Sequence, residues 1–378
     1  MLNPAYPAAR AVAVRVHDYF AKLFERAGSM ASSFPPLPEA AAIETVIDTA
    51  FWASLRREEG YVPHISLALI AEPHARHPLC FARPLPLVPW QLAKLAPAVE
   101  RKGIHLGVAP ESGRLVVWGT SWTVPPNAVV VEVIAPGLLV VKHRRSEESA
   151  KFANIAVLEG DRVKLIDQGV PRQPDCPGVL TSFFGYDSVA QWVDSADILV
   201  PFATSMRAHG RGGALLVVPA GSDHWRESIV EPIPYGVEPA FGELAAFLGT
   251  PEARAGLDGR SERLLRAIDA LAGLTAVDGA TIMTTRYELL AFGAKIGRRG
   301  TLPPVEKLVY SEPVEGSRPE VIHPVQLGGT RHLSAAQFVQ DQQDSVALVA
   351  SQDGRFTVFT WSPAKRMVVA YRVDSLLL

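Results

Sequence analysis

The stretch GGTRHLSAAQF, residues 328–338, combines groups that suit phosphate binding with the start of an expected helix over residues 334–343. Arg331 offers a planar set of donors that matches a phosphate, and His332 can donate, accept or ligate a metal. The N-terminal amides of the helix would add positive partial charge at the same place. The stretch therefore predicts a phosphate site, although a plain glycine turn with Thr330 as the helix N-cap explains the same letters.

Two other stretches place acidic residues at strand ends. VDGATIM sets Asp278 and Gly279 at the start of an expected strand, and ALVASQDGRF sets Ser351, Gln352 and Asp353 at the end of another. A carboxylate there can hold a divalent cation through oxygen, and a neighbouring hydroxyl can contact a phosphate. Asp-Gly is also the usual composition of a tight turn, so both stretches stay open to a purely conformational interpretation.

The elements that would position these residues fall into two regions. In the first, helical patterns cover residues 5–27, 39–60 and 89–103, and β-branched runs separated by turn residues predict strands within 64–72, 103–120, 128–145 and 154–168. This region predicts an α+β domain up to about residue 170.

The second region alternates helices and strands. It contains expected helices at 187–210, 261–274 and 334–343, a buried apolar strand within 212–221, and further strands within 279–285, 288–296, 345–352, 356–361 and 367–373. A proline-rich excursion spans 297–327. The chain is thus expected to be α/β with mixed α+β content, divided into domains 1–230 and 231–378. The proline- and glycine-rich loop near 170–180 is a possible further boundary.

Composition excludes several classes of protein. The 378 residues carry a formal net charge of −2, which gives no basic excess for a nucleic-acid or membrane-surface partner. Cys80 and Cys176 lie far apart without metal-ligand spacing, which favours a reducing cytosol over a disulfide framework. No long apolar run predicts a leader or a membrane span. We expect a soluble, cytoplasmic protein.

The order of the motifs resembles the diadenylate cyclase (DAC) domain, the family that condenses two ATP molecules into cyclic di-AMP. Its two hallmark motifs are Asp-Gly-Ala and Gly-Thr-Arg-His-Arg, which correspond here to residues 278–280 and 329–333, with a serine downstream at 351. The resemblance covers roughly residues 235–378, or a longer part that begins with the GGALLVVP strand at 212–219. It implies a mixed central sheet flanked by helices, and the preceding part resembles the sensor-like domains of some family members.

The resemblance also implies a site. Asp278 would hold Mg²⁺ or Mn²⁺ and help activate a 3′-hydroxyl, Arg331 and His332 would act with it as catalytic residues, and Asp353 would be a second metal ligand. Further nucleotide contacts are implied at Gly279, Ala280, Gly293, Ala294, Ile296, Gly329, Thr330 and Ser351. The partners implied are ATP as substrate and a second copy of the chain, because family members act only as a homodimer or higher oligomer with facing domains.

Two departures from the family pattern support an alternative function. Leu333 replaces the last arginine of Gly-Thr-Arg-His-Arg, and Gln352 leaves Asp353 as the one acid after the serine. Losing a charge-assisted contact of this kind costs about 1.5 to 3 kcal/mol, which slows an enzyme without abolishing it. Because Asp278, Arg331 and His332 all remain, an active enzyme is favoured, and the alternative is a non-catalytic sensor that binds ATP or cyclic di-AMP.

Four other stretches have residue types that could bind ligands. HARH at 74–77 has histidines with a possible metal spacing but is expected to be a solvated loop. GRGG at 210–213 and GRRG at 297–300 lack a Walker pattern; the first is expected to begin a strand and the second to form a basic turn. SDHW at 222–225 has the residue types of a catalytic triad, but adjacency in sequence is not triad geometry.

Overall fold

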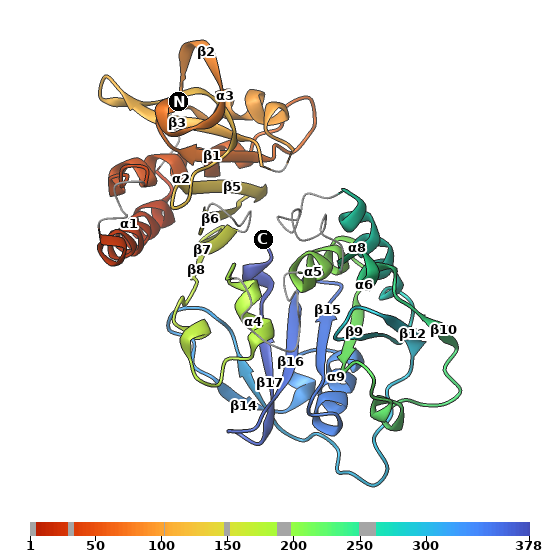
Figure 1. Cartoon of the computed structure of the whole chain (residues 1–378). Coiled ribbons are helices and arrows are strands. Elements are labelled where there is room, and N and C mark those ends of the chain that lie inside the picture. Colours follow the sequence, from red (N-terminus) through yellow and green to blue (C-terminus); the bar gives the residue numbers. More distant parts are fainter. Residues whose placement is uncertain (1–4, 29–33, 102, 147–151, 187–197, 249–261) are drawn as a thin grey trace. The chain divides into compact units, whose positions relative to one another are not determined.

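The computed structural model describes residues 5–28, 34–101, 103–146, 152–186, 198–248 and 262–378 (Figure 1). The chain has mixed α+β content with two mixed sheets, as its sequence predicts. It separates into two compact units, residues 1–166 with Leu378 and residues 167–377. Within the described residues, no helix is long and apolar enough to cross a membrane.

Unit 1 is an eight-stranded sheet with helices packed on one face. Its helices are α1 (Pro7–Ala27), α2 (Ala40–Ser54) and α3 (Pro89–Leu95). Its strands are β1 (Ile65–Leu69), β2 (Arg76–Pro86), β3 (His105–Glu111), β4 (Arg114–Thr123), β5 (Val129–Ala135), β6 (Leu138–Arg144), β7 (Phe152–Glu159) and β8 (Arg162–Leu165), in the spatial order β2-β4-β3-β1-β5-β6-β7-β8. Among these described strands, β1 and β3 are the one parallel pair.

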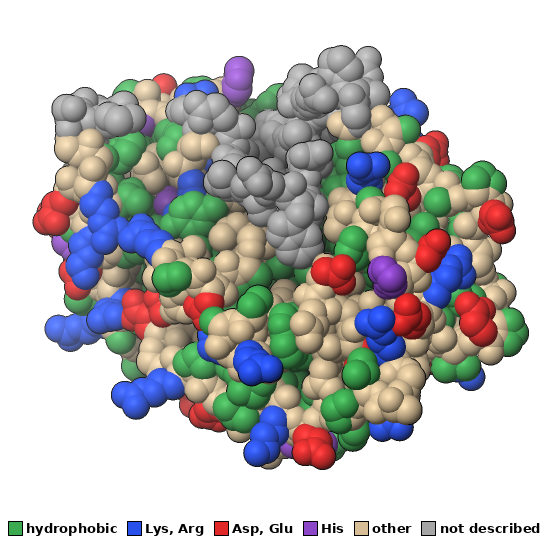
Figure 2. Space-filling view, turned by 60° about the horizontal axis from the view of Figure 1, so that its bottom comes forward, with side chains coloured by type: hydrophobic (Ala, Val, Ile, Leu, Met, Phe, Trp, Pro, Cys, Tyr) green, Lys and Arg blue, Asp and Glu red, His purple; other side chains and the backbone are tan. Residues whose placement is uncertain are grey.

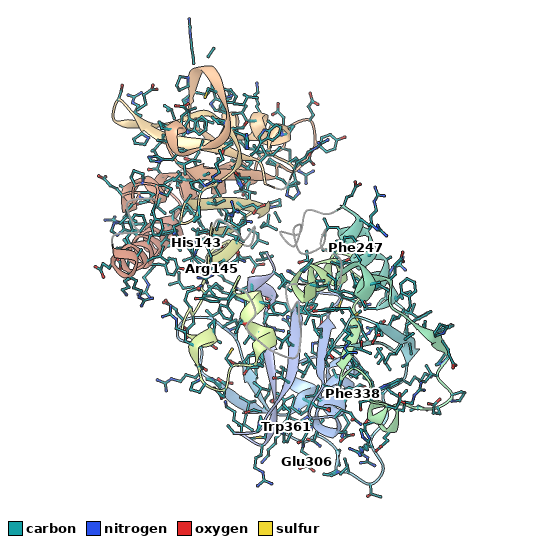
Figure 3. All side chains as sticks on the ribbon, viewed as in Figure 1. His143, Arg145, Phe247, Glu306, Phe338 and Trp361 are labelled. Carbon is teal, nitrogen blue, oxygen red and sulfur yellow. The ribbon has the colours of Figure 1, made fainter. Side chains whose placement is uncertain are left out.

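Alternation along the strands explains why the helices of unit 1 cover this face. Leu67 of β1 and Val131 of β5 pair directly, and both join a core cluster with Val16 of α1 and Ile47 of α2. Side chains alternate across a strand, so every second apolar residue reaches the helices. Buried His143 of β6 contacts the Tyr19 hydroxyl through Nε2 at 2.9 Å (Figure 3).

Unit 2 is a nine-stranded sheet with helices on both faces. Its helices are α4 (Gly178–Phe183), α5 (Leu199–Ala208), α6 (Glu243–Leu248), α8 (Glu262–Leu274) and α9 (Thr330–Asp341). Its strands are β9 (Gly213–Val218), β10 (Tyr235–Phe241), β11 (Ala280–Thr284), β12 (Leu289–Ala294), β13 (Leu308–Ser311), β14 (Glu320–Ile322), β15 (Val346–Ala350), β16 (Phe356–Ser362) and β17 (Met367–Arg372). The spatial order is β10-β12-β11-β9-β15-β16-β17-β13-β14.

Helix α9 packs on one face of this sheet and α5 contacts β15 on the other (Figure 1). Phe338 of α9 is fully buried in a cluster with Leu216 and Val349, and Trp361 packs against the same cluster (Figure 3). All six residues of β9 are buried. The sequence prediction of a strand buried on both faces within 212–221 is therefore confirmed.

The boundary expected at 230/231 needs correction. β9 lies between β11 and β15 in the middle of the second sheet, so a cut at residue 230 would remove a central strand from unit 2. The compact units divide at 166/167, just before the loop near 170–180 that the sequence offers as a further boundary.

Several local expectations also differ from the structure. Helix α9 begins at Thr330 rather than 334, and its N-cap is Gly329, not Thr330. The expected loop containing HARH is in part strand, because β2 begins at Arg76 and forms an edge where its prolines need no partner. The excursion at 297–327 contains two short strands, β13 and β14, and β14 forms an edge of the sheet. Of the helix expected at 187–210, α5 is the described part, and 187–197 lie outside the described residues.

Charged side chains of both signs are interspersed on the face of the molecule that Figure 2 shows. This pattern fits the small formal net charge of −2. That face shows no large area covered by Lys and Arg alone, which is the kind of surface that attracts polyanions.

Candidate functional site

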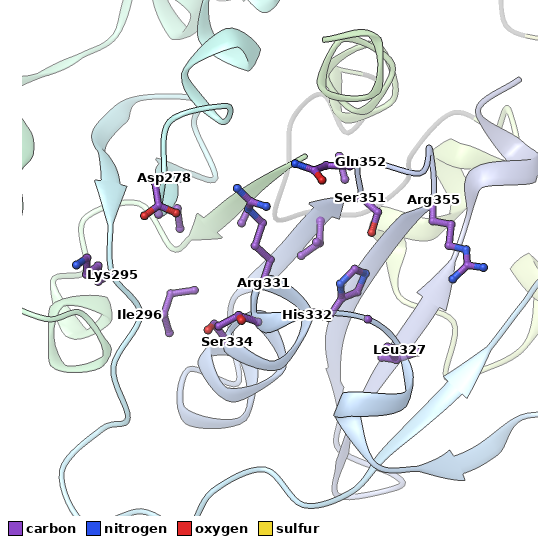
Figure 4. Close-up of a pocket in the computed structure, with 18 of the residues that line it drawn as sticks. Asp278, Lys295, Ile296, Leu327, Arg331, His332, Ser334, Ser351, Gln352 and Arg355 are labelled. Carbon is purple, nitrogen blue, oxygen red and sulfur yellow. The ribbon is translucent and has the colours of Figure 1, made fainter. Parts of the chain in front are cut away.

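A pocket of about 740 Å³ lies where six elements of unit 2 begin or end. The starts of β9 and β11, the end of β12, the β15–β16 hairpin and the N-terminus of α9 meet there (Figure 4). Its lining residues are Ala214, Asp278, Gly279, Ala280, Ala294, Lys295, Ile296, Leu327, Gly328, Gly329, Thr330, Arg331, His332, Ser334, Val349, Ala350, Ser351, Gln352, Asp353 and Arg355. The volume is in the range of small-molecule sites, roughly 300–1,000 Å³.

Close backbone packing places Asp278 at the pocket wall. A Cβ on Gly279 would lie 2.4 Å from the carbonyl carbon of Gly293, and Gly279 has φ +109°. Only glycine fits such a close approach with this backbone conformation. Ala280 next to it pairs with Ala294 of β12 and with Ala214 of β9, which fixes the strand start.

The N-terminus of α9 presents a positive end to the pocket. The N-cap residue of α9 is Gly329, so no side chain of that residue caps the helix, and no acidic residue lies in the first turn. The His332 amide donates to the Gly329 carbonyl at 3.0 Å, whereas the amides of Thr330 and Arg331 before it keep their donor capacity and their positive partial charge. An anion at this place would be bound by the backbone as well as by side chains.

Arg331 is the half-buried cation of this first turn. Its Nη1 lies 3.3 Å from the position that a Cβ on Gly212 would take, so Gly212 leaves room for the guanidinium. Its Nε is buried without a hydrogen-bond partner among the described residues. In Figure 4, Arg331 lies between Asp278 and Ser351. An unsatisfied buried donor of this kind is costly unless a ligand pairs with its group.

His332 is buried, with only 3% of its surface exposed. Gly328 lies over the ring, because a Cβ at that position would be 2.7 Å from Nδ1, and Phe359 contacts the ring from the sheet. Burial, together with the charges of Arg372 and Arg355, lowers its pKa to about 4, although Asp353 acts in the opposite direction. His332 is thus neutral near pH 7, and its Nε2 has no partner among the described residues.

The β15–β16 hairpin closes the other side of the pocket. The Ser351 amide donates to the Arg355 carbonyl at 2.8 Å, and the Gly354 amide donates to the Ser351 carbonyl at 3.2 Å. Arg355 Nε lies 3.1 Å from a carboxylate oxygen of Asp353. One oxygen of Asp353 is therefore already paired with a cation.

The structure brings together the residues that the sequence indicated. Asp278, Arg331, His332, Ser351 and Asp353 all line the pocket, as do the neighbouring glycines and alanines of the motifs. Gly293 does not line it but packs directly behind Gly279. Their roles in binding or catalysis stay predictions.

Two cationic lining residues were missed from the sequence. Lys295 lies between the expected contacts Ala294 and Ile296, and Arg355 follows the hairpin turn. Lys295 lies one residue beyond the end of β12, so alternation along that strand does not indicate the direction of its side chain. The pairing of residues 351 and 355 across a tight hairpin was the signal available for Arg355.

The two departures from the family pattern have clear positions. Leu333 packs against the core cluster under α9 and does not line the pocket. Gln352 lines the pocket and donates from its side-chain amide to the Arg211 carbonyl at 3.3 Å. Arg211 belongs to GRGG, which begins β9 as expected.

The remaining sequence candidates lie away from this pocket. Arg299 of GRRG lines a second cavity of about 970 Å³ and forms an ion pair with Glu227, while its amide donates to Asp341 at 2.9 Å. The imidazole of His224 in SDHW contacts Glu227 at 3.3 Å, and only the backbone amide of His224 donates to the Ser222 hydroxyl, at 3.4 Å. No cluster of three or more potential metal ligands occurs in the described part of the chain, which includes HARH.

Residues 32–122 match a family model. Its description is "Probable sensor domain DACNV", a domain typical of diadenylate cyclase proteins. The match lies within unit 1 and includes α2, α3 and β1 to β4. No curated protein matches the chain.

Proposed function

We propose that unit 2 is a diadenylate cyclase domain, which condenses two ATP molecules into cyclic di-AMP and two diphosphates, and that unit 1 regulates it. The observation that carries the proposal is the convergence of residues 278–280, 329–332 and 351–353 on one pocket. These segments lie on different elements, so their meeting does not follow from sequence proximity. The sensor family matched by unit 1, typical of this class of enzyme, supports the same assignment.

The pocket has the groups that this reaction needs. The oxygen of a 3′-hydroxyl forms a bond to an α-phosphorus while the bond from that phosphorus to the diphosphate oxygen breaks; the electron pair leaves with diphosphate, and the hydroxyl proton is released to base or solvent. Such transfers are accelerated by positioning and by neutralising charge. Arg331 and the α9 amides supply fixed positive charge at one pocket wall, and Asp278 supplies a carboxylate at another.

A divalent cation fits the donor set at Asp278. Its side chain is exposed to the pocket, and no described residue donates a hydrogen bond to its carboxylate. Mg²⁺ in nucleotide enzymes is typically held by one or two carboxylates with phosphate oxygens. Bound there, Mg²⁺ or Mn²⁺ would neutralise phosphate charge and acidify the attacking hydroxyl.

The reaction needs a second copy of the chain. Each pocket would hold one ATP, and the 3′-hydroxyl of that ATP must meet the α-phosphate of the other ATP. Two facing pockets of unit 2 satisfy this requirement, so we propose that the active form is a homodimer or a higher oligomer.

The alternative is a non-catalytic nucleotide sensor. It is favoured by the positions of Leu333, which packs against the core cluster instead of lining the pocket, and of Asp353, which is paired with Arg355. With Asp353 paired, Asp278 is the one acidic lining residue without an ion pair to the described residues. A binding protein would tolerate the lack of a second unpaired carboxylate in the pocket more easily than an enzyme would.

Mass spectrometry distinguishes the two functions. The full chain is incubated with ATP and either Mn²⁺ or Mg²⁺ at several protein concentrations, and the nucleotide products are identified. The cyclase predicts cyclic di-AMP with diphosphate, with a rate that rises more than linearly with protein concentration while assembly is incomplete. ATP binding without product at any concentration would favour the sensor.

A further inference from the structure

The register of the β15–β16 hairpin directs Arg355 toward the N-terminus of α9. Val349 pairs with Thr357 and Ala350 with Phe356, so Ser351 and Arg355 are the next opposed pair, joined by their backbone hydrogen bond. Directly opposed residues in an antiparallel pair project to the same face. Ala347 and Val349 on this face pack against α9, so Ser351 and Arg355 continue the same face into the pocket.

Asp353 fixes the guanidinium of Arg355 from one side. The Nε of Arg355 lies 3.1 Å from one carboxylate oxygen, and its amide donates to the other at 3.3 Å. The two terminal Nη nitrogens have no hydrogen bond or ion pair with the described residues. A guanidinium held at Nε presents its remaining donors in a fixed plane, which matches phosphate oxygens.

Arg355 is the cation at its side of the pocket. His332 beside it is buried and neutral near pH 7, and Leu333 packs against the core cluster without lining the pocket. In Figure 4, Arg355 and Asp278 lie at opposite sides, with Arg331, His332 and Ser351 between them. A triphosphate whose α-phosphate is near Asp278 would extend toward Arg355.

We propose that Arg355 binds the terminal phosphates of the nucleotide and that Asp353 is its positioning residue, not a metal ligand. This inference rests on the proposed nucleotide function of the same pocket. Arg355 thereby selects triphosphates over monophosphates, and in the reaction it stabilises the charge that develops on the leaving diphosphate. It supplies from the hairpin a positive charge that position 333 cannot supply from the helix.

Binding measurements on the full chain test this role without turnover. The probes are α,β-methylene-ATP, which cannot transfer its α-phosphoryl group to a hydroxyl with loss of diphosphate, and AMP, both by calorimetry with Mg²⁺. We expect Arg355→Gln to weaken binding of the triphosphate analogue about tenfold to a hundredfold, and Arg355→Lys to restore part of the loss. AMP binding should stay within about twofold, because AMP lacks the groups that Arg355 contacts.

Two further variants separate positioning from other effects. Asp353→Asn should weaken the analogue less than Arg355→Gln does, and titration with Mn²⁺ in the presence of the analogue, followed by electron paramagnetic resonance, should show unchanged metal affinity. Arg366→Gln is the matched control, because Arg366 is an exposed arginine beyond the opposite end of β16. It should bind both probes as the native chain does.

The outcomes against the inference are distinct. Equal binding of the analogue by Arg355→Gln and the native chain overturns it, as does equal weakening for AMP. Loss of Mn²⁺ affinity in Asp353→Asn alone would return Asp353 to the metal site and overturn its positioning role. If the native chain binds neither nucleotide, the proposed function itself fails, and the inference fails with it.

Discussion

At the scale of single residues, Gly279 makes the tightest backbone contact at the pocket. An added Cβ would lie 2.4 Å from the Gly293 carbonyl carbon, which is backbone and cannot move aside easily, and φ is +109°. We expect Gly279→Ala to lower the free energy of unfolding by about 2 to 4 kcal/mol, from backbone strain and overpacking together. Urea unfolding measures this change.

Gly273→Ala provides the control for this substitution. Gly273 lies in α8, and a Cβ there would meet nothing within 4 Å. Alanine in a helix is favoured over glycine by about 0.5 to 1 kcal/mol, so stability should stay equal or rise. If both variants had the same urea midpoint of unfolding as the native chain, the close contact between β11 and β12 would not restrict residue 279 to glycine.

His332 predicts a pH dependence of stability. Its pKa is lowered from 6.5 to about 4 in the folded chain, chiefly by burial. Between pH 6.5 and 4, His332 binds a proton in the unfolded chain but not in the folded chain, which favours unfolding. Above pH 6.5 His332 is neutral in both states, and its full contribution to stability is present. This contribution is lost as the pH falls toward 4. Between pH 7 and 5 the loss should be on the order of 2 kcal/mol.

The measurement compares urea unfolding of the native chain and His332→Gln at pH 7 and pH 5. Glutamine does not titrate, so the variant should lose less stability over this interval than the native chain. Other titrating groups, including buried His105 and His143, contribute equally to both proteins and cancel in the difference. An equal loss of unfolding free energy between pH 7 and pH 5 in the two proteins would show that the folded chain does not hold His332 neutral.

At the scale of elements, the uncapped start of α9 predicts a conflict between stability and binding. Gly329 is the N-cap, and a Cβ there would meet nothing within 4 Å. Gly329→Asp would add a capping carboxylate and raise stability by about 0.5 to 1 kcal/mol. The same charge would repel a phosphate, so affinity for α,β-methylene-ATP should fall about tenfold.

Gly329→Asn separates charge from capping. Asparagine caps a helix about as well as aspartate but carries no charge, so it should stabilise similarly and weaken nucleotide binding less. Thermal unfolding and calorimetry on both variants check this expectation. Native affinity in Gly329→Asp would mean that no anion binds at the start of α9.

How far sequence predicts these elements depends on the length and clarity of each pattern. The all-apolar β9 and the amphipathic α8 are recognisable because six to thirteen residues repeat one pattern. β13 and β14 have four and three residues among prolines, too few to establish alternation. The sequence pattern placed the start of α9 at Ser334 and offered Thr330 as an N-cap, whereas the helix begins at Thr330 with Gly329 as its N-cap.

The same limit applies to the site. Arg331 is recognisable because glycines precede it and a helix follows. Arg355 is not, because its direction depends on hairpin register, and the burial of His332 depends on Gly328 and the distant Phe359. Long-range packing therefore determines which polar residues line the pocket and which charge they carry.

At the scale of the whole molecule, each unit has its own sheet and its own core cluster. We expect residues 167–378 alone to bind α,β-methylene-ATP, because the pocket lies entirely in unit 2. If unit 1 controls how cyclase domains face each other, its removal should change the rate of cyclic di-AMP synthesis about fivefold or more.

Analytical ultracentrifugation and product assays on both chains test this regulatory role. A changed assembly state together with a changed rate would support control by unit 1. An identical assembly state and an identical rate in the shortened chain would contradict it, while leaving the pocket in unit 2 unaffected.

The most direct test of the central claim is the rate of cyclic di-AMP formation by the full chain and by Asp278→Asn, quantified by mass spectrometry with Mn²⁺ or Mg²⁺. Asp223→Asn is the control, because Asp223 is 88% exposed and lies outside the pocket. If the chain is a cyclase, the native chain and the control should form cyclic di-AMP, and the rate of formation should fall about a hundredfold or more in Asp278→Asn. No product from the native chain with either metal, while α,β-methylene-ATP still binds, would contradict the claim.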